Sequence, residues 1–264
     1  MKTGTINIRL PQACRTSEIV RATLIVASLC LLTLLPASTA FAQKKYSRTF
    51  PARKNITITL SNRSGAITVE GWDKDLIKIS ADMEAPAAKF TPVIDANGIT
   101  IDVVRDNQGR VDVGSVNFKI SVPFDSSVYI DTVLGDLTVN NVTGETVRAH
   151  VNSEGNILLT DIRAKAVMAH NIMGDIFFDG ELLSGGIYTL QSNSGNINIR
   201  IPQNSSFYLN AVAPNTREIT LGPFAGSGLS YIGDKRKVTG NVGNARAIVS
   251  IVNLRGSISF IPRK

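Results

Sequence analysis

Two histidines and two carboxylates are the residues of this chain whose types and spacing could support chemistry. His150 and His170 are the only histidines, and they lie 20 residues apart. Asp161 and Glu181 show the same separation. If the chain repeats every 20 residues, each pair occupies equivalent positions on neighbouring strands, about 4.8 Å apart. The two pairs therefore raise two possibilities, a metal site and a glycosidase site.

The histidine pair lacks the further ligands that a metal site needs. Structural zinc sites use four protein ligands, and catalytic sites use three. The next residue in the same column is Leu190, and the chain beyond residue 42 contains no cysteine. Alternation with Val147 and Ala149 places both imidazoles on the outer face. We predict that His150 and His170 form a surface ladder, with no metal ligand and no cofactor.

The carboxylate pair fits a glycosidase only in its spacing. Two carboxylates about 5 Å apart suit a retaining glycosidase, and Asp161 and Glu181 would follow Asn141 in one column. No third acid, lysine or aromatic sugar platform lies in register with them. We therefore predict solvated turn residues and no catalytic residue. Glu145 and Lys165 share another column. We therefore predict an ion pair between them that contributes little to stability.

The elements that would position these residues are short strands in a repeat of about 20 residues. A glycine, an Asp or Asn, and alternating apolar residues recur at Gly135, Gly155, Gly174 and Gly195, with looser copies at Gly65, Gly98 and Gly256. The four regular glycines are 20, 19 and 21 residues apart, which indicates a local deletion and a bulge near Gly180. This period predicts an all-β, β-solenoid stack in which each repeat, called a rung here, packs on its neighbours.

Alternation within each rung predicts the buried and exposed side chains. Two inward ladders are expected, namely Leu137, Ile157, Ile176 and Ile197, and Val139, Leu159, Phe178 and Ile199. The corner glycines would adopt left-handed backbone angles, and the following Asp or Asn would bond its own turn. Leu158, Met168, Phe177, Tyr188 and Leu190 are predicted to face outward. They would form an apolar partner surface, unless residues 203–245 cover them.

Residues 1–42 have the pattern of a secretory signal peptide. Basic residues precede a 12-residue apolar run, Leu24–Leu35, and Ala40-Phe41-Ala42 precedes the expected mature start at Gln43. An uncleaved membrane anchor is the alternative. Residues 43–264 would form one β-repeat domain, with irregular strands at 43–130, regular rungs at 131–202 and C-terminal strands and a cap at 203–264. Both cysteines fall within the signal, so the exported chain would have no disulfide.

Charge gives little information about partners. The whole chain carries +7, and residues 1–42 hold four basic and one acidic residue, which leaves +4 on the remainder. This mild charge permits contact with anionic envelope polymers or lipids, as does the basic turn at 234–237. The chain shows no interleaving of basic and aromatic residues of the kind that binds nucleic acid.

In their order, these motifs resemble the putative adhesin or DUF4097 family of bacterial β-strand-repeat proteins. The resemblance rests on the Gly65–Val69 phrase followed by Trp72, on the four regular glycine phrases, and on the closing segment 253–258. It implies a β-solenoid-like fold, an exported location and no established catalytic residue. Our leading hypothesis is a non-catalytic envelope module, periplasmic or at the cell surface, that binds an envelope protein or glycan. A polysaccharide-active β-helix enzyme and an envelope-stress sensor remain alternatives.

Overall fold

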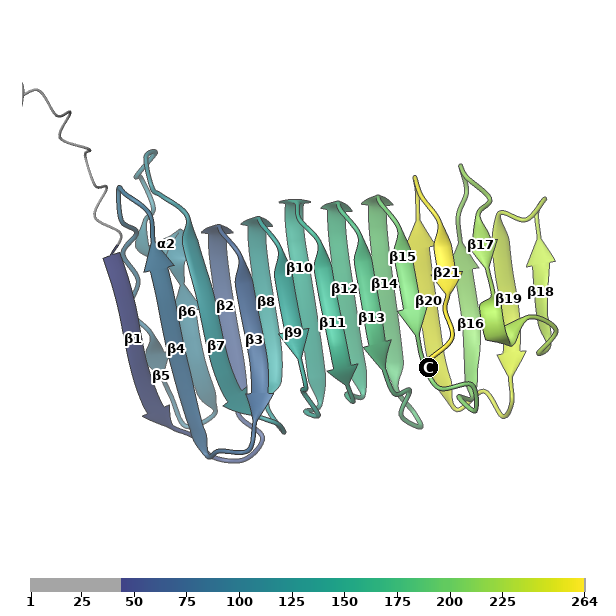
Figure 1. Cartoon of the computed structure of the whole chain (residues 1–264), viewed down its shortest axis with the longest axis horizontal. Coiled ribbons are helices and arrows are strands. Elements are labelled where there is room, and N and C mark those ends of the chain that lie inside the picture. The colour runs from purple at the N-terminus through teal and green to yellow at the C-terminus, as the bar shows by residue number, and fades with distance from the viewer. Residues whose placement is uncertain (1–43, 264) are drawn as a thin grey trace, which may run out of the picture. The chain divides into compact units, whose positions relative to one another are not determined.

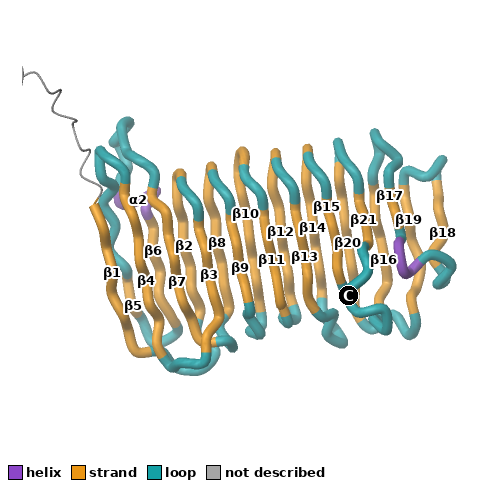
Figure 2. Tube along the Cα trace, viewed as in Figure 1, coloured by secondary structure: helices purple, strands orange, loops and turns teal. Residues whose placement is uncertain are grey.

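The computed structural model describes residues 44–263, which form a nearly all-β unit; the predicted signal peptide lies outside them. The strands form two large sheets on either side of a hydrophobic core (Figures 1 and 2). Sheet A contains, in spatial order, β1 (Lys44–Pro51), β4 (Leu76–Met83), β7 (Val116–Pro123), β3 (Ile67–Trp72), β9 (Leu137–Asn140), β11 (Ile157–Ile162), β13 (Ile176–Gly180), β15 (Ile197–Arg200), β21 (Ile258–Phe260) and β17 (Ile219–Thr220). Sheet B contains β18 (Leu229–Ile232), β19 (Lys237–Val242), β16 (Phe207–Val212), β20 (Ala247–Asn253), β14 (Ile187–Ser194), β12 (Ala166–Met173), β10 (Thr146–Glu154), β8 (Ser127–Leu134), β2 (Thr57–Ser64), β6 (Gly98–Asp102) and β5 (Val93–Ile94). Two short helical turns, α2 (Val103–Asp106) and η1 (Gly222–Phe224), complete the described chain.

Most neighbouring strands are parallel because the chain alternates between the two sheets. It passes from β10 in sheet B to β11 in sheet A, and returns to β12 beside β10. Residues about 20 apart are therefore in register: Ile157 pairs with Leu137 on one side and Ile176 on the other. Antiparallel pairs occur towards the two ends, as between β1 and β4 and between β16 and β19.

The regular stack extends beyond the predicted range 131–202. Strands β2 and β3 pair directly with β8 and β9, so the segment between them in sequence lies further out, towards one end. Strands β20 and β21 likewise pair with β14 and β15, and β16–β19 lie beyond them. The predicted excursion at 203–245 thus extends the sheets and leaves Leu158 exposed (Figure 1).

Alternating apolar residues form the core as predicted. Every residue of the two inward ladders is buried. The ladders also continue to both sides, since Ile67 pairs with Leu137 and Ile258 pairs with Ile197. Burying large aliphatic side chains removes apolar surface from water in each rung, at about 25 cal/mol per Å². No rung can do this alone, so the stacking of neighbours is what stabilises the fold.

One corner of the stack is a column of glycines with positive φ. Its members are Gly65, Gly135, Gly155, Gly174, Gly195 and Gly256. A Cβ at Gly155, where φ is +156°, would overlap the carbonyl oxygen of Gly135 in the preceding rung. Two features therefore require glycine at this position: the close approach of the neighbouring rung and the positive φ angle. The looser copy at Gly98 does not belong to this column, because it pairs with Thr57 in sheet B.

The Asp or Asn after each of the four regular corner glycines, Gly135, Gly155, Gly174 and Gly195, connects two rungs. We expected this side chain to bond its own turn, but Asp136 Oδ1 accepts from the backbone N–H of Asn156 at 2.8 Å. Asn156 Oδ1 accepts in the same way from Asp175, and Asp175 Oδ1 from Asn196, at 2.8 and 2.7 Å. These bonds satisfy backbone donors at the corner that the sheets leave unpaired.

A second polar column is buried just before the same corner. It consists of Asn62, Thr132, Asn171, Ser192 and Asn253, with Val151 among them. The Asn171 amide donates to the carbonyl oxygens of Gly155 and Gly174, at 3.2 and 2.9 Å. Buried carbonyls need such partners, so these asparagines stabilise the bend of the chain from sheet B into sheet A. The repeat pattern of the sequence does not predict this column.

Strand β14 lies one residue out of the predicted register. Val167 pairs with Tyr188, 21 residues later, and the predicted outward residues Tyr188 and Leu190 are both buried. The side chain of Ile187, the residue before Tyr188, is 53% exposed. The turn before β14 (181–186) is three residues longer than the turn before β12 (163–165), which exceeds by one the two residues that β13 lacks relative to a 20-residue period. A shift of one residue moves every side chain of a strand to the opposite face.

Candidate functional site

The outer face of sheet B holds a hydrogen-bonded row of ionisable side chains. His150 and His170 are in register on β10 and β12, and His170 Nδ1 lies 2.8 Å from His150 Nε2. On the other side, His150 Nδ1 lies 3.0 Å from Asp131 Oδ1 on β8. Arg148 donates to the same carboxylate oxygen at 3.2 Å. The predicted histidine ladder is thus present, and it extends to an aspartate that the sequence analysis missed.

The hydrogen bonds determine which nitrogens carry protons. A carboxylate only accepts, so His150 Nδ1 carries the proton that it donates to Asp131. His150 Nε2 is then the acceptor for the Nδ1–H of His170, which leaves His170 Nε2 as the free end of the row. Burial and, to a smaller extent, the neighbouring His150 lower the pKa of His170 below 6.5. The lowered pKa favours the neutral form of the His170 imidazole at pH 7.

The residue after His170 in this column is Gln191 and not the predicted Leu190. Between residues 44 and 263, no group of three or more His, Cys, Asp or Glu side chains is arranged to hold a metal ion. In the same part of the chain, no helix is long and apolar enough to cross a membrane.

The two carboxylates considered for glycoside hydrolysis are each paired with a different arginine. Asp161 contacts Arg263 at 3.4 Å, and Glu181 contacts Arg163 at 3.4 Å. The side chain of Asp161 is 69% exposed and that of Glu181 is 50% exposed. Neither carboxyl is in an apolar environment of the kind that keeps a general acid protonated. Glu181 lies in the turn after β13 as predicted, whereas Asp161 lies in β11. The two carboxylates do not share the predicted column, because Ile162 pairs with Gly180.

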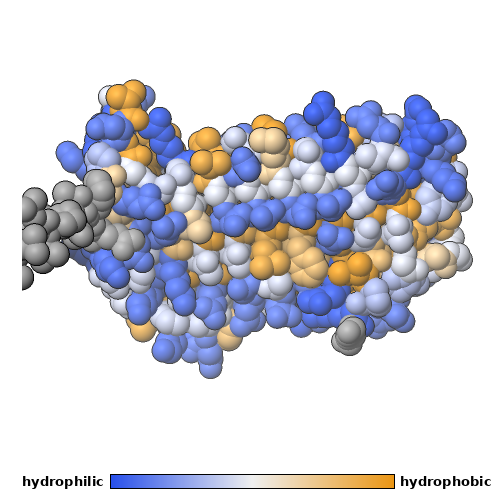
Figure 3. Space-filling view, turned by 45° about the horizontal axis from the view of Figure 1, so that its top comes forward, coloured by the Kyte–Doolittle hydropathy of each residue, from blue (hydrophilic) through white to orange (hydrophobic). Residues whose placement is uncertain are grey.

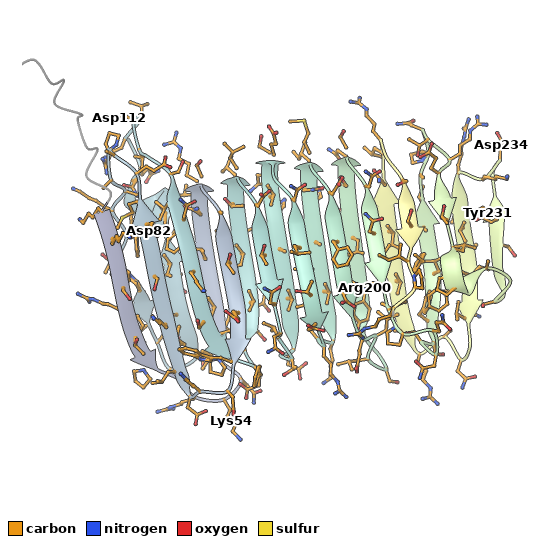
Figure 4. All side chains as sticks on the ribbon, in the orientation of Figure 1. Lys54, Asp82, Asp112, Arg200, Tyr231 and Asp234 are labelled. Carbon is orange, nitrogen blue, oxygen red and sulfur yellow. The ribbon has the colours of Figure 1, made fainter. Side chains whose placement is uncertain are left out.

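Other predicted charged contacts also have clear partners. Glu145 and Lys165 lie 3.2 Å apart and are largely exposed, as expected for a weak surface pair. In the turn at 234–237, Asp234 pairs with Arg217 of a neighbouring loop. This turn lies beside β18 at one end of the stack (Figure 4).

A buried ion pair on sheet A was not expected. The carboxylate of Asp179 is only 6% exposed and accepts from Arg200 at 2.6 Å. This hydrogen bond raises the pKa of Arg200 further above its usual value. The guanidinium also lies over the Phe177 ring, 5.2 Å from its centroid. Arg263 approaches Asp179 at 3.5 Å, which ties the end of the described chain to β13.

The outward apolar residues lie on both sheets. Leu158 and Met168 are exposed as predicted, and Phe177 is half-buried. Ile187, Ile248 and Tyr208 pair across β14, β20 and β16, and they form an exposed apolar column on sheet B. Hydrophobic patches beside a hydrophilic band are visible on the surface (Figure 3).

Concavities on the described surface are shallow. One of about 420 Å³ follows the glycine corner and is lined by Leu134, Glu154, Met173 and the adjoining turn residues. A smaller one of about 190 Å³ lies on sheet B beside the histidine row. Its lining residues are Arg148, Ala149, His150, Met168, Ala169, His170, Thr189 and Gln191.

A profile of the Toastrack DUF4097 family matches residues 53–210, which is more than half of the sequence. The chain belongs to the Toastrack DUF4097 family. This confirms the resemblance inferred from the glycine phrases. The match includes β2–β15 and part of β16, and therefore the histidine row and every glycine of the corner except Gly256.

Solved structures resemble the Toastrack chain in fold at low sequence identity. A putative cell adhesion protein from Clostridium sporogenes has 11% identity and a TM-score of 0.52, and the comparison covers 84% of this chain and all of that one. A putative adhesin from Bacteroides fragilis has 10% identity and a TM-score of 0.39, with 84% and 99% of the two chains covered. A search of the curated proteins gave no match.

The sequence contained signals for two missed contacts of the Toastrack chain. Asp131 precedes His150 by 19 residues, so the period of 20 alone leads to Ile130; aligning the apolar pair Val128 and Ile130 with Val147 and Ala149 would have found Asp131. The contact between Asp179 and Arg200 had a similar signal, since each residue follows its corner glycine by five positions and the two are paired in register on β13 and β15. The position of Ile248 depends on β20 inserting beside β14, which the order of strands along the chain does not indicate.

Proposed function

We propose that this Toastrack protein is a non-catalytic, exported envelope protein that binds or scaffolds its partner through the outer face of sheet B. The observation that supports this most directly is a flat block of outward side chains on β14, β20 and β16. None of them carries a formal charge: Ile187, Thr189, Gln191, Ile248, Ser250, Val252, Tyr208, Asn210 and Val212. Large exposed patches with apolar content are typical of interaction sites.

The same block supports a binding role over a catalytic one. The side chains of Ile187 and Ile248 are 53% and 47% exposed. Exposing these apolar side chains to water costs free energy and does not stabilise the fold. We interpret the whole stack as a β-solenoid, a scaffold that presents equivalent side chains at regular spacing. The similar Clostridium sporogenes protein is named as a putative cell adhesion protein, which agrees with a binding module.

Binding to intact envelopes, followed by mass spectrometry of the captured material, tests the proposal. We expect Ile248→Asp to reduce capture strongly, because it places a carboxylate in the centre of the apolar column. Leu158→Asp is the matched control, since Leu158 is similarly exposed on sheet A. Both variants should retain the wild-type melting temperature. Equal capture by the wild type and Ile248→Asp would show that sheet B is not the binding face.

The location is tested separately. If residues 1–42 are a cleaved signal, N-terminal sequencing of the exported protein should begin at Gln43. A membrane-bound form that retains Leu24 would instead favour the anchored, sensor-like alternative.

A further inference from the structure

The small cavity on sheet B contains groups that recognise an anion. It lies between the outward columns of β10, β12 and β14 and has a volume of about 190 Å³. Whole small-molecule ligands occupy cavities of about 300–1,000 Å³, so this one suits a single chemical group or one sugar of a longer polymer. Arg148, His170 and Gln191 line it with nitrogen atoms, and Thr189 adds a hydroxyl.

Several of these groups have unused hydrogen-bonding capacity. The carboxylate of Asp131 occupies one terminal nitrogen of Arg148, which leaves its other N–H groups free to donate. Within residues 44–263, the side chains of Gln191 and Thr189 make no hydrogen bond, and neither does His170 Nε2. Asp131 itself does not line the cavity. A bound group would therefore meet donors, with the only nearby carboxylate already engaged by Arg148 and His150.

The charge of the row selects a monoanion. Asp131 on β8 and Arg148 on β10 balance each other, while His150 and His170 are the remaining ionisable groups facing the cavity. A proton added at His170 Nε2 breaks no hydrogen bond, because His170 Nδ1 still donates to His150. The site then has one uncompensated positive charge, which matches a carboxylate better than a phosphate monoester of charge about −1.5 to −2.

We propose that this cavity binds the carboxylate of an acidic sugar in an envelope glycan. The carboxylate contacts Arg148, the protonated Nε2 of His170 and the Gln191 amide. Met168, which is 42% exposed, packs against the C–H groups of the sugar ring. The uncharged block on β14, β20 and β16 adjoins the cavity and would contact the following sugars. This inference rests on the proposed binding function and specifies its ligand.

Affinity for the carboxylate depends on pH in a defined direction. Ligand binding favours the protonated form of His170, so affinity increases as the pH falls through the pKa of this residue. It decreases again when the sugar carboxyl itself is protonated, near pH 3–4. A gained positive charge beside the carboxylate is expected to increase affinity about fivefold at a partly exposed site.

Isothermal titration of the purified protein with tetragalacturonate, at pH 5.5 and pH 7.5, tests the proposal. We expect binding about fivefold tighter at pH 5.5, with a shift of the His170 ring resonances in NMR spectra. Arg148→Gln should abolish binding at both pH values. His170→Gln keeps a donor in place and should leave weak binding that no longer depends on pH. Lys165→Gln is the control, because its exposed ion pair with Glu145 lies away from the cavity.

Four results overturn the inference. These are no binding of tetragalacturonate, equal binding of neutral cellotetraose, binding that Arg148→Gln leaves intact, and preferential binding of inorganic phosphate or of vesicles with anionic lipids. If one of these occurs while intact envelopes still capture the protein through Ile248, the binding function stands with a different ligand. If envelope capture fails as well, the proposed function fails too.

Discussion

In this protein, the side chains that follow the regular corner glycines form hydrogen bonds to the neighbouring rung and not within their own rung. Asp and Asn alternate after the corner glycines, as Asp136, Asn156, Asp175 and Asn196, and each accepts a hydrogen bond from the backbone of the next rung. Adjacent rungs are about 4.8 Å apart, so four aspartates would place like charges at that distance. The alternation separates the carboxylates by two rungs, about 10 Å, near the screening length of salt at 0.1 M.

The histidine row makes stability depend on pH. The pKa of His170 is lower in the folded protein than in the unfolded chain, so the unfolded chain binds the proton first as the pH falls. Its contribution is complete above about pH 6.5 and is lost as the pH falls through that value. Urea unfolding of the wild type should therefore show lower stability at pH 5.5 than at pH 7.5.

His170→Gln removes the titrating group and should lessen that loss. Gln occupies the equivalent position in the next rung, so the substitution fits the strand. The same pH dependence in both proteins would mean that His170 does not contribute to it.

At the scale of strands, the sequence pattern predicts most faces correctly and fails at one turn. The glycine period and the alternation of apolar residues are local, so the burial of Ile157 and Phe178 follows from them. The turn before β14 is three residues longer than the turn before β12, and no local rule determines how many of these residues belong to the turn and how many to the strand. Tyr188 is buried because its hydroxyl donates to the Ala164 carbonyl at 2.9 Å. The sequence does not predict this hydrogen bond between Tyr188 and Ala164, because it depends on the folded structure.

The register of β11 can be tested with a pair of neighbouring residues. Ile157 is 1% exposed, whereas Leu158 is 39% exposed. Ile157→Ala should cost about 2–5 kcal/mol, the range for a large-to-small change in a core. Ile157→Asp should prevent folding, because it buries an unpaired carboxylate. Circular dichroism and denaturant melts should show that Leu158→Asp folds normally; the reverse result would place the opposite face of β11 inward.

An alanine substitution in the glycine corner is expected to reduce the stability of the protein more than a substitution at an exposed glycine. At Gly155 a methyl group meets the Gly135 carbonyl as well as an unfavourable φ, so Gly155→Ala should destabilise the protein by about 2 kcal/mol or more. Gly109→Ala is the control, because φ is +82° there and a Cβ has nothing within 4 Å. Left-handed strain alone should cost about 1–2 kcal/mol. If Gly155→Ala and Gly109→Ala lost the same stability in denaturant melts, the rungs would not be in close contact at the corner.

At the scale of the whole stack, sequence order and spatial order differ at both ends. The C-terminal strands β20 and β21 lie between the central rungs and β16–β19 (Figure 1). Their side chains Val249, Ile251 and Phe260 are buried. Completion of the core therefore requires the last part of the chain, a non-local requirement that the repeat pattern cannot predict. Non-local pairing of this kind is expected to slow folding.

This arrangement predicts that removing residues 246–264 abolishes the fold. The deletion takes away the strands that pair with both β14 and β16, so two sheet edges and an apolar core would be exposed in the interior of the stack. Removing residues 44–51 is the contrast, because β1 pairs only with β4 and is mostly exposed. The first variant should aggregate or lack a cooperative melt, whereas the second should unfold cooperatively with a moderate loss of stability. If the stack instead followed sequence order, the C-terminal deletion would only shorten one end, and its melt would stay cooperative with a proportionally smaller m-value.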